Sequence, residues 1–219
     1  MVELIRDLRA EHVRDNLERA RARIAATGRD PNEIEILAAV KYVPVEELEV
    51  LAEAGLELLG ENRAQDLAAK AEACPGRFTW DFIGHLQSRK VRQVLPYVRY
   101  IHSVSSDSVL AQLERHGTRE TKVLVEVNVA GEEGKSGIEP GELDTFLERC
   151  PVTVVGLMTM PPLAASPEDS RPHFAALREL AAPRGLKELS MGTSQDFVVA
   201  VEEGATIVRL GTSLYVPTG

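Results

Sequence analysis

A lysine stands at the end of the first long apolar run in the chain. Residues 34–42 read IEILAAVKY, and Lys41 is followed closely by a proline and a helix-like segment. In parallel α/β folds, the carboxyl ends of the strands form the face where chemistry takes place. A lysine that emerges from a buried strand is partly desolvated, and its neutral amine can condense with an aldehyde or ketone to form a Schiff base. The alternative is an ordinary rim lysine paired with an acid, which is the commoner situation.

Two glycine-containing segments near the end of the chain predict an anion site. In SMGTSQD, residues 190–196, we expect Ser194 to cap a helix, and backbone amides at a helix N-terminus favour phosphate. In RLGTS, Gly211 and Thr212 directly follow the last apolar run and offer free amides. Barrels often bind phosphate with the loops after their seventh and eighth strands, so the two segments are stronger together than apart. A plain helix cap is the alternative for the first segment.

An arginine lies inside the last predicted strand. By the two-residue period of a strand, Arg209 faces the same side as Gly211. A buried charge needs a partner or a ligand. The sequence leaves open whether Arg209 forms an ion pair inside the fold, for example with Glu126 of the fifth strand, or contacts a bound molecule.

The remaining predicted strand ends carry few groups that titrate near neutral pH. They include Asn62, Gly84, His85, Asn128 and Met158. A single histidine such as His85 is more often part of hydrogen-bonded structure than a general base. These ends contain no pair of carboxylates and no cluster of histidines or cysteines, so we expect no metal site.

Eight apolar runs alternate with helix-like segments along the chain. The runs cover residues 34–42, 56–62, 78–86, 100–104, 122–129, 152–160, 187–192 and 206–211. Such alternation predicts parallel strands with helical crossovers, and eight units is the number that closes a (β/α)8 TIM barrel. We expect a single domain over residues 1–219, with an extra N-terminal helix over residues 3–26. An open doubly wound sheet is the alternative, but it lacks a glycine fingerprint after the first strand.

Composition narrows the possible partners. The 219 residues carry a net charge of −9, which argues against general affinity for nucleic acid or anionic membranes. Cys74 and Cys150 are far apart and read as free thiols in a reducing compartment. No apolar run is long enough to span a bilayer, and the first residues lack a signal-peptide core. We therefore expect a cytoplasmic protein. The predicted helices mix acidic and basic residues, and on that basis we expect a monomer.

Seven segments together resemble the pyridoxal phosphate homeostasis proteins, which are single-domain relatives of the alanine racemase N-terminal barrel. They are AAVKY, LGEN, FIGHLQSRK, the KSG of residues 135–137, VVGLMTM, LSMGTSQD and VRLGTSLY, in that order. The resemblance runs from about residue 36 to residue 215. It departs from the family pattern at Thr193, where methionine is expected. This is a modest change beside Ser194, and it should not abolish phosphate binding.

The resemblance implies a cofactor and a role for each strand end. Lys41 would carry pyridoxal 5'-phosphate (PLP) as a Schiff base, and Arg209 would point at the pyridine nitrogen. The phosphate would be held by Ser194 and by the amides of Gly211 and Thr212. The residues implied to line or approach the ring are Asn62, Ile83, His85 and Met158.

Arg209 also bears on the chemistry that the resemblance implies. Arginine only donates hydrogen bonds, so it leaves the pyridine nitrogen unprotonated and the ring a poor electron sink. Racemases of this fold use a second domain that brings a tyrosine base, and we expect no such domain here. The leading hypothesis is a protein of PLP homeostasis with little or no turnover, which would buffer the cofactor and pass it to apo PLP-dependent enzymes.

Two enzyme hypotheses stand beside this one. In a small PLP-dependent amino-acid racemase or lyase, Tyr42, Tyr97 or His85 would have to supply the second base. A Schiff-base aldolase acting on a sugar phosphate also needs a lysine and a phosphate loop. The strand arginine has no obvious task in an aldolase, which makes it the weaker alternative.

Overall fold

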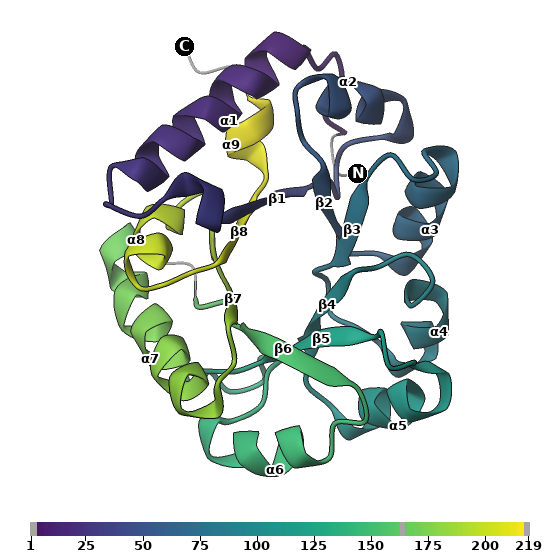
Figure 1. Ribbon diagram of the computed structural model, residues 1–219, viewed down its shortest axis with the longest axis vertical. Helices are drawn as coiled ribbons and strands as arrows, with labels where there is room; N and C mark the ends of the chain where they lie inside the picture. Colours follow the sequence, from purple (N-terminus) through teal and green to yellow (C-terminus); the bar gives the residue numbers. More distant parts are fainter. Residues whose placement is uncertain (1–3, 163–164, 217–219) are drawn as a thin grey trace.

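Eight parallel strands close into one barrel, with the helices on the outside (Figure 1). The computed structural model describes residues 4–162 and 165–216. Each strand pairs with its neighbours in the chain, and β1 pairs with β8 to close the barrel. The strands are β1 (Glu35–Ala39), β2 (Leu58–Glu61), β3 (Thr79–Phe82), β4 (Tyr100–Val104), β5 (Lys122–Glu126), β6 (Thr153–Met158), β7 (Glu188–Thr193) and β8 (Ile207–Leu210). The predicted (β/α)8 barrel is confirmed, and the open doubly wound sheet is wrong.

The crossover segments form helices and short 3-10 turns around the barrel. The α-helices are α1 (Ala10–Ala25), α2 (Leu48–Glu53), α3 (Ala64–Ala73), α4 (Val91–Val94), α5 (Asp107–His116), α6 (Leu143–Glu148), α7 (Arg171–Ala181), α8 (Phe197–Glu202) and α9 (Thr212–Tyr215). The 3-10 turns are η1 (Pro31–Glu33), η2 (Val45–Glu47), η3 (Ser88–Lys90), η4 (Pro140–Glu142), η5 (Pro167–Ser170) and η6 (Ala182–Arg184). No helix in the described residues has the length and apolar character needed to cross a membrane.

The leading helix begins later than the sequence predicts. α1 starts at Ala10, while the preceding segment bonds to the loop after β1. The Ile5 amide donates to the Tyr42 carbonyl at 2.8 Å, and the Leu8 amide donates to the Glu47 carboxylate at 3.2 Å. These tertiary bonds hold the segment beside the mouth of the barrel, so it does not continue the helix.

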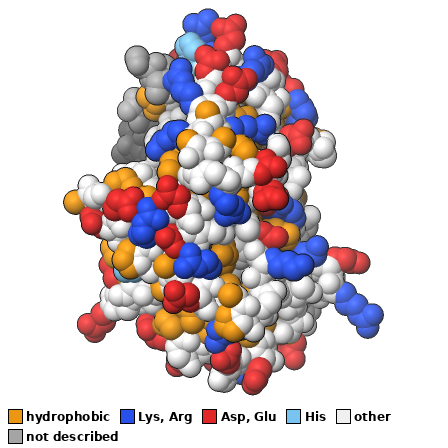
Figure 2. Space-filling view, turned by 60° about the vertical axis from the view of Figure 1, so that its left-hand side comes forward, with side chains coloured by type: hydrophobic (Ala, Val, Ile, Leu, Met, Phe, Trp, Pro, Cys, Tyr) orange, Lys and Arg blue, Asp and Glu red, His pale blue; other side chains and the backbone are white. Residues whose placement is uncertain are grey.

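Charged side chains cover the outer helices and join some of them. Figure 2 shows acidic and basic side chains interspersed across one face of the molecule. Arg171 of α7 donates to Glu202 at 2.6 Å and to Glu203 at 3.0 Å, which links α7 to the end of α8. The interior, by contrast, is mostly aliphatic. It also holds a set of buried polar residues inside the barrel, which are Asp81, His102, Glu126, Ser190 and Arg209.

Candidate functional site

Lys41 lies at the mouth of the barrel but beyond the strand that leads to it. β1 ends at Ala39, and Lys41 occupies the following turn with an exposed side chain. Its Nζ lies 4.8 Å from the ring centroid of Tyr42. The predicted desolvation of this lysine is therefore wrong, because the strand ends two residues early and the turn carries the side chain out to solvent.

Two adjoining cavities open at the mouth and divide the predicted site residues between them. The larger, of about 870 Å³, is lined by Lys41, Asn62, Ser194, Gly211 and Thr212 among others. The smaller, of about 260 Å³, is lined by other side chains, which include His85, Glu126, Asn128, Lys135 and Met158. Ile83, Gly84, Met160 and Arg209 line both cavities. The structure therefore brings most of the predicted residues together but places His85 and Met158 on the side away from the lysine.

A buried ion pair holds the chain on both sides of Lys41 and Asn62. The Lys70 ammonium of α3 donates to Glu61 Oε1 at 2.5 Å and to the Val40 carbonyl at 2.7 Å. The other Glu61 oxygen accepts from the Asn62 amide at 2.7 Å. The side chains of Lys70 and Glu61 are only 7% and 0% exposed. One pair of charges thus satisfies backbone groups that lie beyond the strand ladder and fixes the turn that carries Lys41.

A tyrosine from the last helix fixes the same turn from another direction. The Tyr215 hydroxyl donates to the Ala39 carbonyl at 3.2 Å. Burial, with a smaller contribution from the Glu61 charge, raises the pKa of Tyr215 well above its ordinary value. The hydroxyl therefore stays protonated and remains a donor at any physiological pH.

Asn62 offers a buried acceptor beside the lysine. Within the described part of the chain, its Oδ1 is the one buried side-chain oxygen or nitrogen that has no hydrogen-bond partner. Its backbone packs directly on Gly84, where an added Cβ would lie 2.1 Å from the Asn62 carbonyl oxygen. A buried polar atom without a partner is costly, so this oxygen suits a ligand that donates a hydrogen bond.

Ser194 connects two loops and does not cap a helix. α8 begins at Phe197, and the residue before it, Asp196, makes no side-chain cap. The Ser194 hydroxyl oxygen instead accepts from the Gly211 amide at 3.1 Å and from the Ser213 hydroxyl at 2.8 Å. The helix-cap expectation is wrong because residues 194–196 form a turn of their own after β7. The two predicted anion segments nevertheless lie in contact.

Thr193, at the departure from the family pattern, belongs to that turn. Its amide and its hydroxyl both donate to Asp196 Oδ1, at 2.7 and 3.0 Å. The hydroxyl has a bond that a methionine could not make, so the substitution is compatible with an ordered loop.

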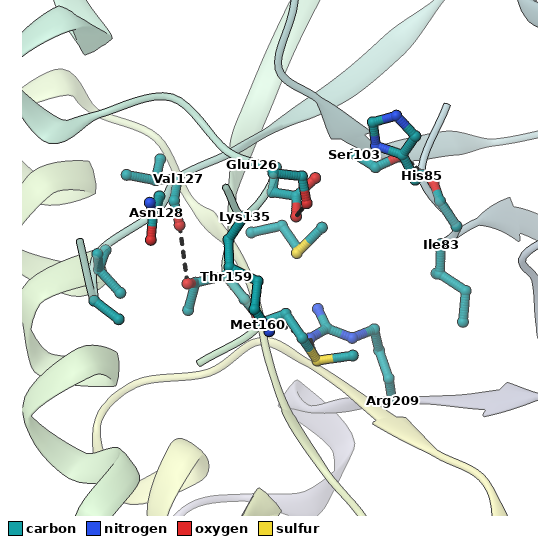
Figure 3. Close-up of a pocket in the computed structure, with 15 residues that line it drawn as sticks. Ile83, His85, Ser103, Glu126, Val127, Asn128, Lys135, Thr159, Met160 and Arg209 are labelled. Carbon is teal, nitrogen blue, oxygen red and sulfur yellow. Dashed lines mark hydrogen bonds between the residues drawn. The ribbon is translucent and has the colours of Figure 1, made fainter. Parts of the chain in front are cut away.

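Arg209 is buried and is held entirely by neutral groups. Its Nη1 donates to the carbonyl and the hydroxyl of Ser190, at 2.8 and 2.7 Å, and its Nη2 donates to the Thr159 carbonyl at 2.9 Å. The suggested ion pair with Glu126 is not among its contacts in the described residues, and the Glu126 carboxylate instead accepts from the Ser136 hydroxyl at 2.6 Å. Burial lowers the pKa of Arg209 to about 10, although Glu126 and Asp196 act in the opposite sense. Arg209 is thus a cation at neutral pH that lines both cavities. Figure 3 shows it beside Met160 in the smaller one.

Three residues that support the site from behind were not predicted from the sequence, and these are Lys70, Glu61 and Tyr215. One signal was present for Lys70, which lies on the same face of α3 as the buried residues Ala64 and Leu67. A lysine on an apolar helix face indicates a buried partner. The described residues contain no group of three or more His, Cys, Asp or Glu side chains that could hold a metal ion.

Residues 8–218 match the family model described as alanine racemase, N-terminal domain. The protein is therefore a barrel of the alanine racemase N-terminal type. The pyridoxal phosphate homeostasis protein of Aquifex aeolicus is 42% identical, over 91% of this chain and 93% of its own. The human pyridoxal phosphate homeostasis protein is 34% identical, over 90% of this chain and 82% of its own. The chain belongs to the pyridoxal phosphate homeostasis protein family.

A solved structure of a similar protein adds a ligand to the comparison. PipY of Synechococcus elongatus, solved with PLP bound, is 29% identical and superposes with a TM-score of 0.79. The match covers 93% of this chain and 100% of that one. The family resemblance noted in the sequence is thereby confirmed.

Proposed function

We propose that this protein binds PLP in the larger cavity, linked covalently to Lys41, and serves in homeostasis of the cofactor. One observation carries the proposal, which is that three groups line the same cavity. They are the accessible amine of Lys41, the unpaired buried oxygen of Asn62 and the Arg209 cation. The relatives support it, since they are named for PLP homeostasis and PipY was solved with PLP bound.

The residues of the larger cavity suit each part of the cofactor. The Lys41 amine would attack the aldehyde carbon, forming a carbon–nitrogen double bond as water leaves. Ser194, Gly211 and Thr212 would hold the phosphate, with the Gly211 amide turning from the serine hydroxyl to the anion. Arg209 would donate to the pyridine nitrogen.

The other predicted residues would contact the ring from its sides. Asn62 would accept a hydrogen bond from the ligand through its unpaired Oδ1. Ile83 lines both cavities and would pack on the ring. His85 and Met158 would approach it only from the smaller cavity.

Low turnover follows from the same arrangement. A cofactor ring whose nitrogen receives a hydrogen bond from arginine stabilises a carbanion poorly. Of the three candidate second bases, only Tyr42 lines the cavity of Lys41. Tyr97 lies outside both cavities, where its hydroxyl donates to Glu72. We therefore infer a protein that holds and releases the cofactor, and that passes it as a monomer to apo PLP-dependent enzymes.

An amino-acid racemase is the second candidate, because Tyr42 adjoins Lys41 in the cavity. Incubation with L-alanine in heavy water discriminates between the two. α-Deuteration faster than free PLP achieves, and lost in Tyr42→Phe, would establish the enzyme and end the carrier proposal. An aldolase, which needs no PLP, would be supported by a protein that cleaves a sugar phosphate without the cofactor.

The first experiment is an absorption spectrum of the PLP-treated protein before and after borohydride. We expect a band at about 420 nm, which is typical of a protonated Schiff base of the cofactor. Borohydride should remove the band, because it reduces the Schiff base and leaves PLP permanently attached to the protein. Lys41→Ala should lack the band. Lys122→Ala is the matched control, because this exposed lysine lies at the opposite end of the barrel, at the start of β5. A colourless wild-type protein in the presence of PLP would refute the proposal.

A further inference from the structure

A line of buried polar side chains runs through the barrel from Arg209. The Arg209 guanidinium donates to Ser190 Oγ at 2.7 Å, and that oxygen lies 2.8 Å from His102 Nδ1. His102 Nε2 lies 3.0 Å from Asp81 Oδ2. Asp81, His102 and Ser190 are 0% exposed and line neither cavity. The line therefore lies behind the ligand-binding face and is connected to it through Arg209.

The far end of this line is anchored at the opposite rim of the barrel. Arg99 donates to both oxygens of Asp81, at 3.1 and 2.8 Å, and also to Glu35 at 2.9 Å. The Tyr100 amide donates to Asp81 as well, at 3.1 Å. Glu35 is the first residue of β1, and Arg99 directly precedes β4. The hydrogen bonds thus extend from the mouth of the barrel to its base.

Hydrogen-bond chemistry gives the line a single direction. Arginine can only donate, so Ser190 Oγ accepts from Arg209. The Asp81 carboxylate can only accept, so His102 Nε2 carries a proton and donates it to Asp81. In a neutral ring Nδ1 is then an acceptor, and it receives the hydrogen of the Ser190 hydroxyl.

The protonation states agree with this direction. Burial lowers the pKa of His102, although its hydrogen bond to Asp81 acts in the opposite sense, so the ring is neutral near pH 7. Burial acts to raise the pKa of Asp81, but the hydrogen bonds from His102 and Arg99 outweigh it and lower the pKa. The line thus ends on a carboxylate.

The arrangement has the composition of a catalytic triad but not its accessibility. A nucleophilic serine must reach a substrate, whereas Ser190 Oγ is enclosed and its lone pair is engaged by Arg209. Ordinary satisfaction of buried polar groups would explain each bond alone. It does not explain why the line begins on Arg209, a buried cation that lines both cavities.

We propose that Ser190, His102 and Asp81 are positioning residues, which form a one-way hydrogen-bond relay that orients the Arg209 guanidinium toward a ring nitrogen of the bound cofactor. The two carbonyls that Arg209 contacts set where the guanidinium lies, and the relay sets the direction of its remaining donors. The hydrogen-bond dipoles of the relay are aligned between the Arg209 cation and the Asp81 carboxylate. This alignment stabilises the charge of Arg209, whose own hydrogen bonds all go to neutral groups. This inference rests on the proposed binding of PLP.

The first test needs no cofactor. Long-range proton–nitrogen NMR of histidine-labelled protein reports the tautomer of each imidazole, and His102→Gln identifies the signal that belongs to residue 102. We expect His102 to be neutral with its proton on Nε2. A proton on Nδ1, or a charged ring at pH 7, would overturn the relay.

The second test uses the holoprotein with PLP labelled with nitrogen-15 in the ring. In Ser190→Ala we expect the ring-nitrogen signal to shift toward that of a nitrogen without a donor, and the Kd for PLP to rise about tenfold, in line with the loss of one hydrogen bond to a charged group. Ser190→Thr, which keeps the hydroxyl, should restore the signal. Thr206→Val is the matched control, since the Thr206 hydroxyl also makes two hydrogen bonds, to Glu188 and Leu189, away from Arg209.

The outcomes separate the relay from the proposed function. The relay alone would be refuted if the wild-type protein takes up PLP but the ring-nitrogen signal does not respond to Ser190→Ala. No response means that the signal is unchanged or moves no more than in Thr206→Val. A wild-type protein that takes up no PLP would refute the proposed function and the ligand-directed role of the relay with it.

Discussion

The two sides of the larger cavity are held by different kinds of interaction. On the lysine side, the buried pair of Lys70 and Glu61 fixes the turn after β1 and the end of β2. On the side of β7 and β8, the loops are joined by hydrogen bonds between neutral groups, which the half-buried Ser194 hydroxyl oxygen accepts from the Gly211 amide and from the Ser213 hydroxyl.

The difference matches what each side would have to do. A buried ion pair is strongly destabilising to break, so it keeps one geometry for the residue that forms a covalent bond. A hydroxyl–amide bond between neutral groups contributes only about 1 kcal/mol, so an arriving phosphate can replace it at little cost. The lysine side is built to stay fixed, and the loop side is built to exchange partners.

Breaking the ion pair should have the largest effect. Lys70→Ala leaves the Glu61 carboxylate buried without its cation, and we expect a loss of about 3–5 kcal/mol in the free energy of unfolding, measured in urea. Arg77→Ala is the control, because its pair with Glu49 is 45% and 63% exposed and should contribute less than about 1 kcal/mol. The double variant Glu61→Gln with Lys70→Met should recover most of the loss. Equal effects of Lys70→Ala and Arg77→Ala would contradict a fixed lysine side.

Crowding Asn62 should have the next largest effect. In Gly84→Ala the new Cβ would lie 2.1 Å from the Asn62 carbonyl oxygen, so the backbone must shift, at a cost of about 1–3 kcal/mol in stability. We also expect weaker uptake of PLP by titration, because Asn62 would move. Gly141→Ala serves as the control, since an added Cβ there meets nothing within 4 Å. Normal stability of Gly84→Ala would show that this close contact is not a constraint.

Removing the Ser194 hydroxyl should affect ligand affinity more than stability. In Ser194→Ala the free energy of unfolding should fall by only about 1 kcal/mol. The affinity for PLP should fall about tenfold, while the affinity for pyridoxal, which has no phosphate, should be unchanged. Comparing the two ligands by fluorescence titration makes the measurement specific for the phosphate side. An equal loss for both ligands would place the serine outside the phosphate site.

The pH dependence of stability should be the smallest effect, and it belongs to neither side of the cavity. The folded protein keeps His102 neutral because burial lowers its pKa, whereas the unfolded chain binds a proton near the ordinary value of about 6.5. Below that pH the unfolded state holds more protons, so the free energy of unfolding should fall as the pH decreases toward the folded pKa of His102. The lowered pKa of Asp81 acts in the same direction at more acidic pH.

Urea unfolding from pH 7 to pH 5 measures this dependence. The decline should be shallower in His102→Phe, and it should persist in His116→Phe, where the residue replaced is exposed. Parallel slopes in the wild type and in His102→Phe would contradict a neutral buried histidine.

Much of the architecture was readable from the chain alone. Alternating apolar and amphipathic segments specify strands and helices because burial follows the period of each element. The order of the segments specifies the barrel, since eight parallel strands joined by helices have few other ways to close. Lys41, Asn62, Ser194 and Gly211 were placed at the mouth on that basis, because strand ends in such a barrel share one face.

The tertiary structure alone decided how those residues are held and exposed. Lys41 is solvent-exposed because β1 ends at Ala39, and a strand end depends on which neighbour still continues the ladder. His102 meets Asp81 and Ser190, which are 21 and 88 residues away in the chain. Periodicity predicts the face on which a side chain lies but not its partner across the barrel, because that depends on strand register and closure. For the same reason, the residues that face the cavity were predictable from the sequence, and those that position them were not.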